Sequence, residues 1–224
     1  MGFDRLVLSQ PACEIGDEAR ARASGAADVL DRASTTRSLS EAVADCGLVI
    51  GASARRRSNN WPELDPRECA ARVAESRHAG PVALVFGPER AGLRNTDLDL
   101  CNALVYIPSN PEYNSLNLAM AVQLIAYELR LALIDEVPAP ASAHPPATAG
   151  DMQHFYEHLE RVLLASGFLD AGNPRHLMRR LRRLFNRAEL DANELNILRG
   201  MLSALVPGSG KRGMAPPEPE ADSQ

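Results

Sequence analysis

The chain of 224 residues contains almost no lysine, because Lys211 is the single lysine among its 24 basic residues and the rest are arginines. Aromatic residues are also scarce, at 4%. No apolar run is long enough to cross a bilayer, and the opening MGFDRLVLSQ lacks the basic and apolar regions of a secretion signal. We therefore expect a cytoplasmic protein with no membrane partner.

Several common functional motifs are missing. The four cysteines are scattered and form no C-x-x-C pair, which favours reduced, partly buried thiols over a disulfide or zinc framework. Neither G-x-G-x-x-G nor the P-loop pattern occurs, so nicotinamide and ATP enzymes lack their usual loops. The HFYEH text at residues 154–158 fits the H-x-x-E-H pattern of zinc peptidases, but no distal carboxylate ligand accompanies it. We expect no metal.

The arginines are concentrated in two places, although the net charge is −5. Arg55, Arg56 and Arg57 form one group, and the segment RHLMRRLRRLFNR at residues 175–187 forms the other. Nucleic-acid binding depends on local patches rather than on total charge, and the planar guanidinium suits phosphate. The clusters therefore keep an RNA partner open.

Short apolar runs alternate with helical patterns along residues 1–136, which predicts an α/β domain with a mostly parallel, doubly wound sheet. Residues 137–150 are rich in proline and alanine and are expected to be a linker. Residues 151–206 predict an all-α, arginine-rich extension, and residues 207–224 a disordered tail. The expected strands are 5–9, 47–51, 82–86 and 103–107, and the expected helices 17–23, 40–45, 66–79, 95–101, 116–133, 151–166, 173–187 and 191–205.

Two loops are expected to meet at the carboxyl edge of the sheet. FGPERAGL, residues 86–93, follows one strand, and NPEYNSLNLAMA, residues 110–121, follows the next and opens a long helix. In an open α/β sheet a ligand usually binds in such a crevice. The two segments together predict a binding site lined largely by backbone groups.

These two segments resemble motifs 2 and 3 of the SpoU/TrmH branch of the SPOUT class of RNA ribose methyltransferases, and most closely the TrmJ type, which are tRNA cytidine/uridine 2′-O-methyltransferases. Weaker similarity covers most of the chain, from Met1 to about residue 206. The resemblance implies a trefoil knot around motif 3, a homodimer, and tRNA as the substrate.

The resemblance also implies S-adenosylmethionine as the cofactor. It assigns cofactor binding to the turn after the second strand and to the two motif loops, at Ala52, Ser53, Ala54, Gly87, Ile107, Asn114, Ser115 and Leu116. Glu89, Ser115 and Asn117 are the implied catalytic residues. We interpret Gly87 as a position where a missing side chain lets a ligand approach the backbone.

Plain structural readings of these residues stay open. Ser115 and Asn117 also suit the cap of a helix. Glu89 could be a solvated turn carboxylate or pair with Arg90 or Arg94. The arginines of residues 173–187 could form a solvated face that pairs with Glu189 or Glu194. We nevertheless expect RNA contacts at Arg55, Arg57, Arg179, Arg180 and Arg183.

Two departures from the family pattern bear on activity. Family members carry an earlier Asn-x-Gly-x-x-x-Arg motif, whose arginine takes part in deprotonating the ribose hydroxyl, and this chain has no such text. We expect that Met1 lies just after that point in a normally active enzyme and that this chain is impaired. Ala52 stands where TrmJ-type proteins usually have threonine, which removes one hydroxyl from the cofactor side.

The expected function is therefore methylation of a tRNA ribose 2′-hydroxyl, with the modified nucleotide left open. An alternative is a non-catalytic RNA-binding protein derived from such an enzyme. A more distant alternative is an α/β enzyme that acts on a small molecule.

Overall fold

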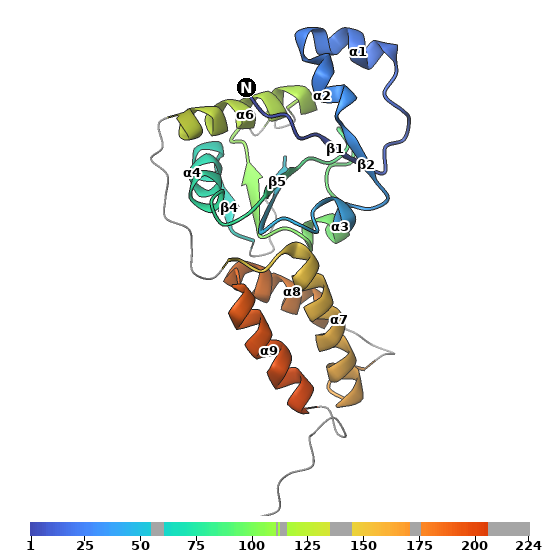
Figure 1. The fold of residues 1–224 in the computed structure, drawn as a ribbon, viewed down its shortest axis with the longest axis vertical. Coiled ribbons are helices and arrows are strands. Elements are labelled where there is room, and N and C mark those ends of the chain that lie inside the picture. Colours follow the sequence, from blue (N-terminus) through green and yellow to red (C-terminus); the bar gives the residue numbers. More distant parts are fainter. Residues whose placement is uncertain (55–60, 111, 113–115, 135–144, 171–175, 206–224) are drawn as a thin grey trace, which may run out of the picture.

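The computed structural model describes residues 1–54, 61–110, 112, 116–134, 145–170 and 176–205 (Figure 1). Its centre is a four-stranded parallel sheet of β3 (Leu48–Ser53), β4 (Glu63–Leu64), β5 (Val82–Val85) and β6 (Ala103–Tyr106), in the order β4-β6-β3-β5. The first four residues of β3 are buried, as expected for an inner strand of a sheet covered on both faces. The α/β fold with a mostly parallel sheet is thus confirmed.

Two helices cover one face of this sheet. α4 (Pro66–Ser76) begins at a capping box in which the Asp65 carboxylate accepts from the backbone N–H of Glu68 at 2.9 Å. α6 (Leu118–Ile134) lies beside it in Figure 1. Both helices bury apolar residues against β3 and β6 in one cluster, composed of Leu48, Ile50, Cys69, Ala70, Val73, Val105, Ile125 and Leu129.

The opposite face is covered by smaller elements. α3 (Leu39–Ala42) is capped by Ser38, whose side chain accepts from the N–H of Glu41 at 3.1 Å. The segment that contains α5 (Asn95–Leu98) also packs here. The cluster on this face is composed of Val43, Cys46, Val49, Trp61, Val85, Leu93, Leu98, Cys101 and Leu104.

A separate parallel pair, β1 (Val7–Ser9) with β2 (Ser34–Thr36), lies beside the main sheet. The connection between its strands contains α1 (Asp17–Ala23), a 3-10 turn (Ser24–Ala26) and α2 (Ala27–Asp31), none of which buries a residue. The sequence pattern predicts neither β2 nor β4, because both are short and polar.

The C-terminal unit, as we call α7 (Ala149–Ala165), α8 (Leu177–Ala188) and α9 (Ala192–Leu205), forms a helical bundle against one end of the sheet (Figure 1). Asp191 caps α9, because its Oδ1 accepts from the N–H of Glu194 at 2.7 Å as the sequence predicts. The bundle has its own core, which includes Ala147, Met152, Phe155, Tyr156, Leu159 and Leu195.

The structure differs from the expected linker at residues 145–150. Ala147 is buried, its N–H donates to the carbonyl of Leu190 at 2.8 Å, and the N–H of Gly150 donates to that of Ala44 at 2.9 Å. Backbone hydrogen bonds hold this stretch although its composition resembles that of a linker. The remaining linker residues, 135–144, and the tail from residue 206 lie outside the described residues, as does part of the segment implied to be knotted.

Candidate functional site

The register of the sheet brings three strand ends together. Gly51 of β3 pairs with Val85 of β5, and Ser53 pairs with Tyr106 of β6. Because the strands are parallel, the residues that follow them emerge at the same edge. The loops after β3, β5 and β6 therefore converge, as the sequence predicts for the two motif loops.

A pocket of about 600 Å³, partly open to solvent, lies at this edge. The structure brings seven of the expected residues into its wall: Ala52, Ser53, Ala54, Gly87, Glu89, Ile107 and Leu116. Other wall residues were not expected, and they include Val105, Leu118 and Ala121. Helical periodicity could have indicated Leu118 and Ala121, because they are three residues apart and so lie on one face at the start of α6. Asn114 and Ser115 lie outside the described residues.

The chain itself gives a reason for glycine at position 87, in addition to the expected approach of a ligand. A Cβ atom there would lie 2.6 Å from the carbonyl oxygen of Gly92 and would also meet the backbone of Leu93. The N–H of Gly92 donates to the carbonyl of Pro88 at 2.7 Å, and Gly92 itself has φ of +64°. The turn thus requires glycine at both positions so that the chain can fold back on itself.

Glu89 connects the two motif loops. Its Oε1 accepts from the backbone N–H of Leu118, the first residue of α6, at 3.3 Å. A carboxylate at a helix N-terminus is favoured because it satisfies a free N–H and interacts with the helix dipole. Asn117 caps the same helix, since its Oδ1 accepts from the N–H of Ala119 at 2.8 Å. Asn117 thus has the helix-capping geometry that the sequence offered as an alternative to a catalytic role.

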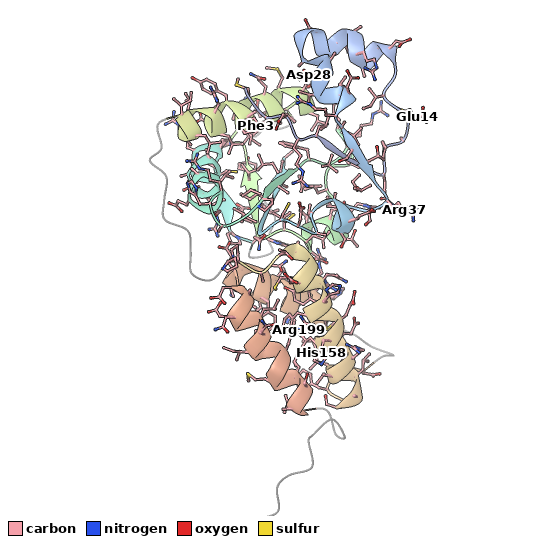
Figure 2. All side chains as sticks on the ribbon, viewed as in Figure 1. Phe3, Glu14, Asp28, Arg37, His158 and Arg199 are labelled. Atoms are coloured by element: carbon pink, nitrogen blue, oxygen red, sulfur yellow. The ribbon has the colours of Figure 1, made fainter. Side chains whose placement is uncertain are left out.

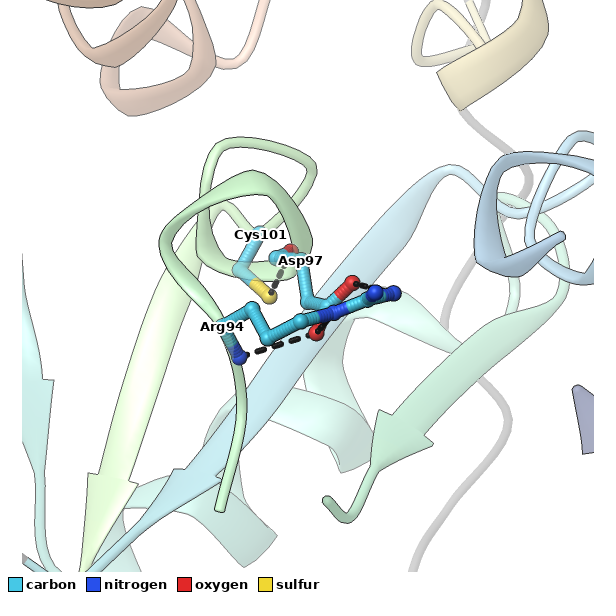
Figure 3. Close-up of polar contacts among 3 residues, drawn as sticks. All are labelled: Arg94, Asp97 and Cys101. Atoms are coloured by element: carbon cyan, nitrogen blue, oxygen red, sulfur yellow. Dashed lines mark hydrogen bonds and ion pairs between the residues drawn. The ribbon is translucent and has the colours of Figure 1, made fainter. Parts of the chain in front are cut away.

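Arg94 is engaged elsewhere and is not the partner of Glu89. Its backbone N–H donates to Oδ2 of Asp97 at 2.8 Å, and its Nε approaches the same oxygen at 3.2 Å (Figure 3). The thiol of Cys101 donates to the carbonyl of Asp97 at 3.4 Å. These contacts brace the segment that leaves the pocket after Gly92.

The arginines of α8 divide into two groups. Arg179 donates from Nε to Oδ1 of Asp99 at 2.9 Å and lies over the ring of Trp61 at 5.9 Å, while Arg183 lies 5.2 Å from the same ring centroid. Arg180 is exposed. The pairing of Arg179 is with Asp99, on the sheet part of the chain, rather than with Glu189 or Glu194. Arg55 and Arg57 lie outside the described residues.

Other reactive groups show no sign of chemistry. Within the described residues no cluster of three or more histidines, cysteines or carboxylates could hold a metal, and His158 lies on α7 of the bundle (Figure 2). Burial raises the pKa of the Cys69 and Cys101 thiols to about 12 and of the Cys46 thiol to about 11. Such thiols stay protonated and unreactive near neutral pH. No helix in the described part has the length and apolar character needed to span a bilayer.

Comparison with known families identifies the family of the chain. The model of the SpoU rRNA Methylase family matches residues 1–127. The chain belongs to the SpoU methylase family. A second model, for the C-terminal domain of the tRNA methyltransferase TrmJ, matches residues 150–215 of this SpoU methylase.

Individual relatives place this SpoU methylase beside TrmJ proteins. It is 49% identical over 210 residues to a tRNA (cytidine/uridine-2′-O-)-methyltransferase TrmJ of Yersinia pestis, covering 92% of this chain and 82% of the relative. The TrmJ of Klebsiella pneumoniae is 51% identical over 211 residues, covering 92% and 86%. The sequence-based recognition of the family is confirmed.

Solved structures agree. The crystal structure of TrmJ from Z. mobilis has a TM-score of 0.78 at 34% identity and covers 91% of this chain and 88% of its own. A probable methylase family protein from Haemophilus influenzae has a TM-score of 0.57 at 41% identity, covering 91% and 84%. The α/β fold with a helical C-terminal part is thus that of SpoU methylases.

Proposed function

We propose that this SpoU methylase transfers a methyl group from S-adenosylmethionine to a ribose 2′-hydroxyl of tRNA, at a cytidine or uridine. The observation that carries the proposal is the pocket at the carboxyl edge of the sheet, in which the loops after β3, β5 and β6 meet. The TrmJ relatives that share about half of its residues support the tRNA substrate.

The pocket has the place and chemistry for this cofactor. It lies at the carboxyl ends of parallel strands, where open α/β sheets usually bind their ligands. Apolar wall residues such as Ile107 and Leu116 suit an adenine ring. S-adenosylmethionine supplies an electrophilic methyl group, and the chain has to bind the cofactor, orient the hydroxyl and accept its proton.

We assign these tasks to the expected residues. Ala52, Ser53, Ala54, Gly87 and Ile107 hold the cofactor together with Asn114, Ser115 and Leu116. Glu89, Ser115 and Asn117 act on the ribose. Glu89 suits a dual role, because its carboxylate caps α6 and the residue lines the pocket.

The tRNA would lie across the exposed arginines. Arg180 on α8 is exposed, and Arg183 retains partial exposure beside Trp61. We place further phosphate contacts at Arg55 and Arg57. Arg179, which was also expected to contact RNA, binds the Asp99 carboxylate. Guanidinium groups suit these contacts because they bind phosphate oxygens in pairs.

A homodimer would cover the outer face of α6. This helix exposes several large apolar residues, and a contiguous apolar surface of this kind is typical of an interface. The exposed fractions are 62% for Met120, 49% for Tyr127, 45% for Leu131 and 55% for Ile134. Free thiols at Cys13, Cys46, Cys69 and Cys101 are consistent with a reducing, cytoplasmic location.

Two measurements test the proposal. Isothermal titration should detect binding of S-adenosylmethionine, and radiolabelled cofactor should transfer its methyl group to unmodified tRNA. Binding of tRNA with no binding of cofactor would instead favour a non-catalytic RNA-binding protein.

Two variants of Glu89 separate its roles. Glu89→Gln keeps an oxygen that can accept from Leu118 and removes the charge, whereas Glu89→Ala removes both. If the charge acts on the ribose, both variants should lower kcat about 100-fold, while the KM for cofactor of Glu89→Gln stays close to the parent. Full activity of Glu89→Gln would mean that Glu89 only caps α6 and that its charge has no role in the reaction.

A further inference from the structure

One short segment connects the pocket to the C-terminal unit. Residues 92–102, which we call the strut, begin at Gly92 in the pocket wall and end at Asn102, which precedes β6. Leu93, Leu98 and Cys101 anchor the strut in the core on one face of the sheet, with exposed fractions of 6%, 0% and 0%. The strut is thus anchored in the core near both of its ends, so a displacement at one end can reach the other.

The strut is braced internally. The Arg94 N–H and side chain both bind the Asp97 carboxylate, and the Cys101 thiol binds the Asp97 carbonyl (Figure 3). The carboxylate of Asp97 is held close to the core, with 13% of its side chain exposed. These bonds link both halves of the strut through one residue.

α8 clamps the far end of the strut. Arg179 donates to the Asp99 carboxylate at 2.9 Å, and Nδ2 of Asn186 donates to the carbonyls of Asp99 at 3.0 Å and of Cys101 at 3.4 Å. Asn186 is buried, and its Oδ1 accepts from the hydroxyl of Tyr156 on α7 at 2.6 Å. Two helices of the C-terminal unit therefore fix the strut through named hydrogen bonds.

The Arg179–Asp99 pair is better suited to fixing geometry than to adding stability. Both side chains are mostly buried, at 24% and 18% exposed, and Nη2 of Arg179 is buried without a partner in the described part of the chain. Desolvation offsets much of the attraction in such a pair, so its net stabilisation is small. What it does supply is a fixed position for Asp99 relative to α8.

We propose that α8 positions the cofactor pocket through the strut, with Arg179 and Asn186 as positioning residues. The C-terminal unit is then part of the pocket's scaffold as well as a surface for RNA. The proposal rests on the proposed function for the identity of the ligand. The position of Gly92, against which Gly87 packs, depends on whether Asp99 is held.

The test compares Arg179→Gln with Arg199→Gln in the full chain. Each variant removes one arginine charge from the C-terminal unit, but Arg199 lies exposed on α9 (Figure 2). Asp99→Asn removes the carboxylate charge that Arg179 binds. Arg179→Lys keeps the positive charge that Arg179→Gln removes. Hydrogen exchange of the strut amides and the Kd of S-adenosylhomocysteine, both without tRNA, are the readouts.

We expect Arg179→Gln and Asp99→Asn to speed exchange at Gly92 and through the strut, and to raise the Kd about three- to tenfold. The double variant should add little to either single one, because both break the same contact. Arg179→Lys should recover part of the lost affinity for S-adenosylhomocysteine, and Arg199→Gln should change neither readout.

Exchange that speeds up only within α7, α8 and α9 would overturn the proposal, as would a Kd for Arg179→Gln equal to that of Arg199→Gln. A parent chain that binds no S-adenosylhomocysteine would count against the proposed function instead, and the exchange measurement would then still decide whether the strut is positioned by α8.

Discussion

The pocket lies at the carboxyl ends of the strands, and the junction with the C-terminal unit lies at the amino ends of the same sheet. The two are built from different groups. The pocket is formed by glycine turns, strand ends and apolar side chains, with Glu89 bridging its two loops. The junction, at the amino ends of β3 and β6, is formed by side-chain hydrogen bonds around Asn186, the buried polar residue of the described core.

The difference follows from what each edge has to do. A pocket for a ligand must keep its polar groups free until the ligand arrives, so backbone turns and apolar walls suit it. A permanent junction must satisfy its buried polar groups within the protein, because each one left unpaired is costly. Mutations at the junction should therefore mainly lower stability, whereas mutations in the pocket should mainly lower ligand affinity.

The largest effect is expected from Asn186→Leu. The substitution removes the donor to the carbonyls of Asp99 and Cys101, whereas the Tyr156 hydroxyl keeps the Arg182 carbonyl as an acceptor at 3.2 Å. Each buried group left unpaired costs about 1–3 kcal/mol. We expect the free energy of unfolding to fall by about 4 kcal/mol, measured by urea denaturation. Asn193→Leu, at an exposed position of α9, should stay near the parent value. An equal loss in both variants would contradict a special role for the junction.

Gly87→Ala tests the pocket side of the comparison. The added Cβ would meet the backbone of Gly92 and Leu93, which cannot move as a flexible side chain could. Overpacking of this kind costs about 1–3 kcal/mol, and we expect the loss of cofactor binding to exceed what the loss of stability explains. Calorimetry with cofactor and thermal unfolding measure the two quantities. Gly25→Ala, where a Cβ would meet nothing within 4 Å, is the control and should be neutral or slightly stabilising.

The pocket could be predicted from the sequence because its residues lie in three short continuous segments, two of which have a recognisable order. Glycines 87 and 92, the apolar strands and the start of α6 all follow from local patterns. The sequence did not reveal, however, that a Cβ at position 87 would meet the chain's own backbone at Gly92 and Leu93. A clash between backbone atoms five residues apart cannot be read from residue types.

The junction could not be predicted, because its partners are far apart in the sequence. Arg179 and Asp99 are 80 residues apart, and Asn186 and Asp99 are 87 apart. The pattern of α8 predicts an amphipathic helix with arginines on its flanks, but it cannot distinguish an arginine that faces Asp99 from one that faces solvent. That distinction requires the tertiary structure.

A pH series tests the buried thiols that lie between the two edges. Burial raises the pKa of Cys101 to about 12, whereas an unfolded thiol has a pKa of about 8.5. Above about pH 8.5 the unfolded chain therefore releases protons that the folded chain retains, so stability should fall as the pH rises toward the folded value. Each such thiol contributes about 1.4 kcal/mol per pH unit.

Cys101→Ala should make the decline between about pH 8.5 and pH 10 shallower by that amount in urea titrations. Cys13→Ala, at an exposed position, should leave the slope unchanged. A slope that is the same in Cys101→Ala and in the parent would mean that the strut opens enough for the thiol to ionise in the folded protein.

The smallest effect is expected from Arg180→Ala, which asks whether the outer face of the C-terminal unit binds tRNA while its inner face holds the junction. Arg180 is exposed, whereas its neighbour Arg179 is bound to Asp99. Loss of one phosphate contact should weaken tRNA binding about threefold and lower the slope of log K against log salt by roughly 0.7 to 0.9, with stability unchanged. Filter binding at several salt concentrations measures both. A slope that falls for Arg179→Gln and not for Arg180→Ala would contradict this separation. It would mean that Arg179 binds phosphate as well as holding the strut, so the RNA face and the junction face would not be distinct.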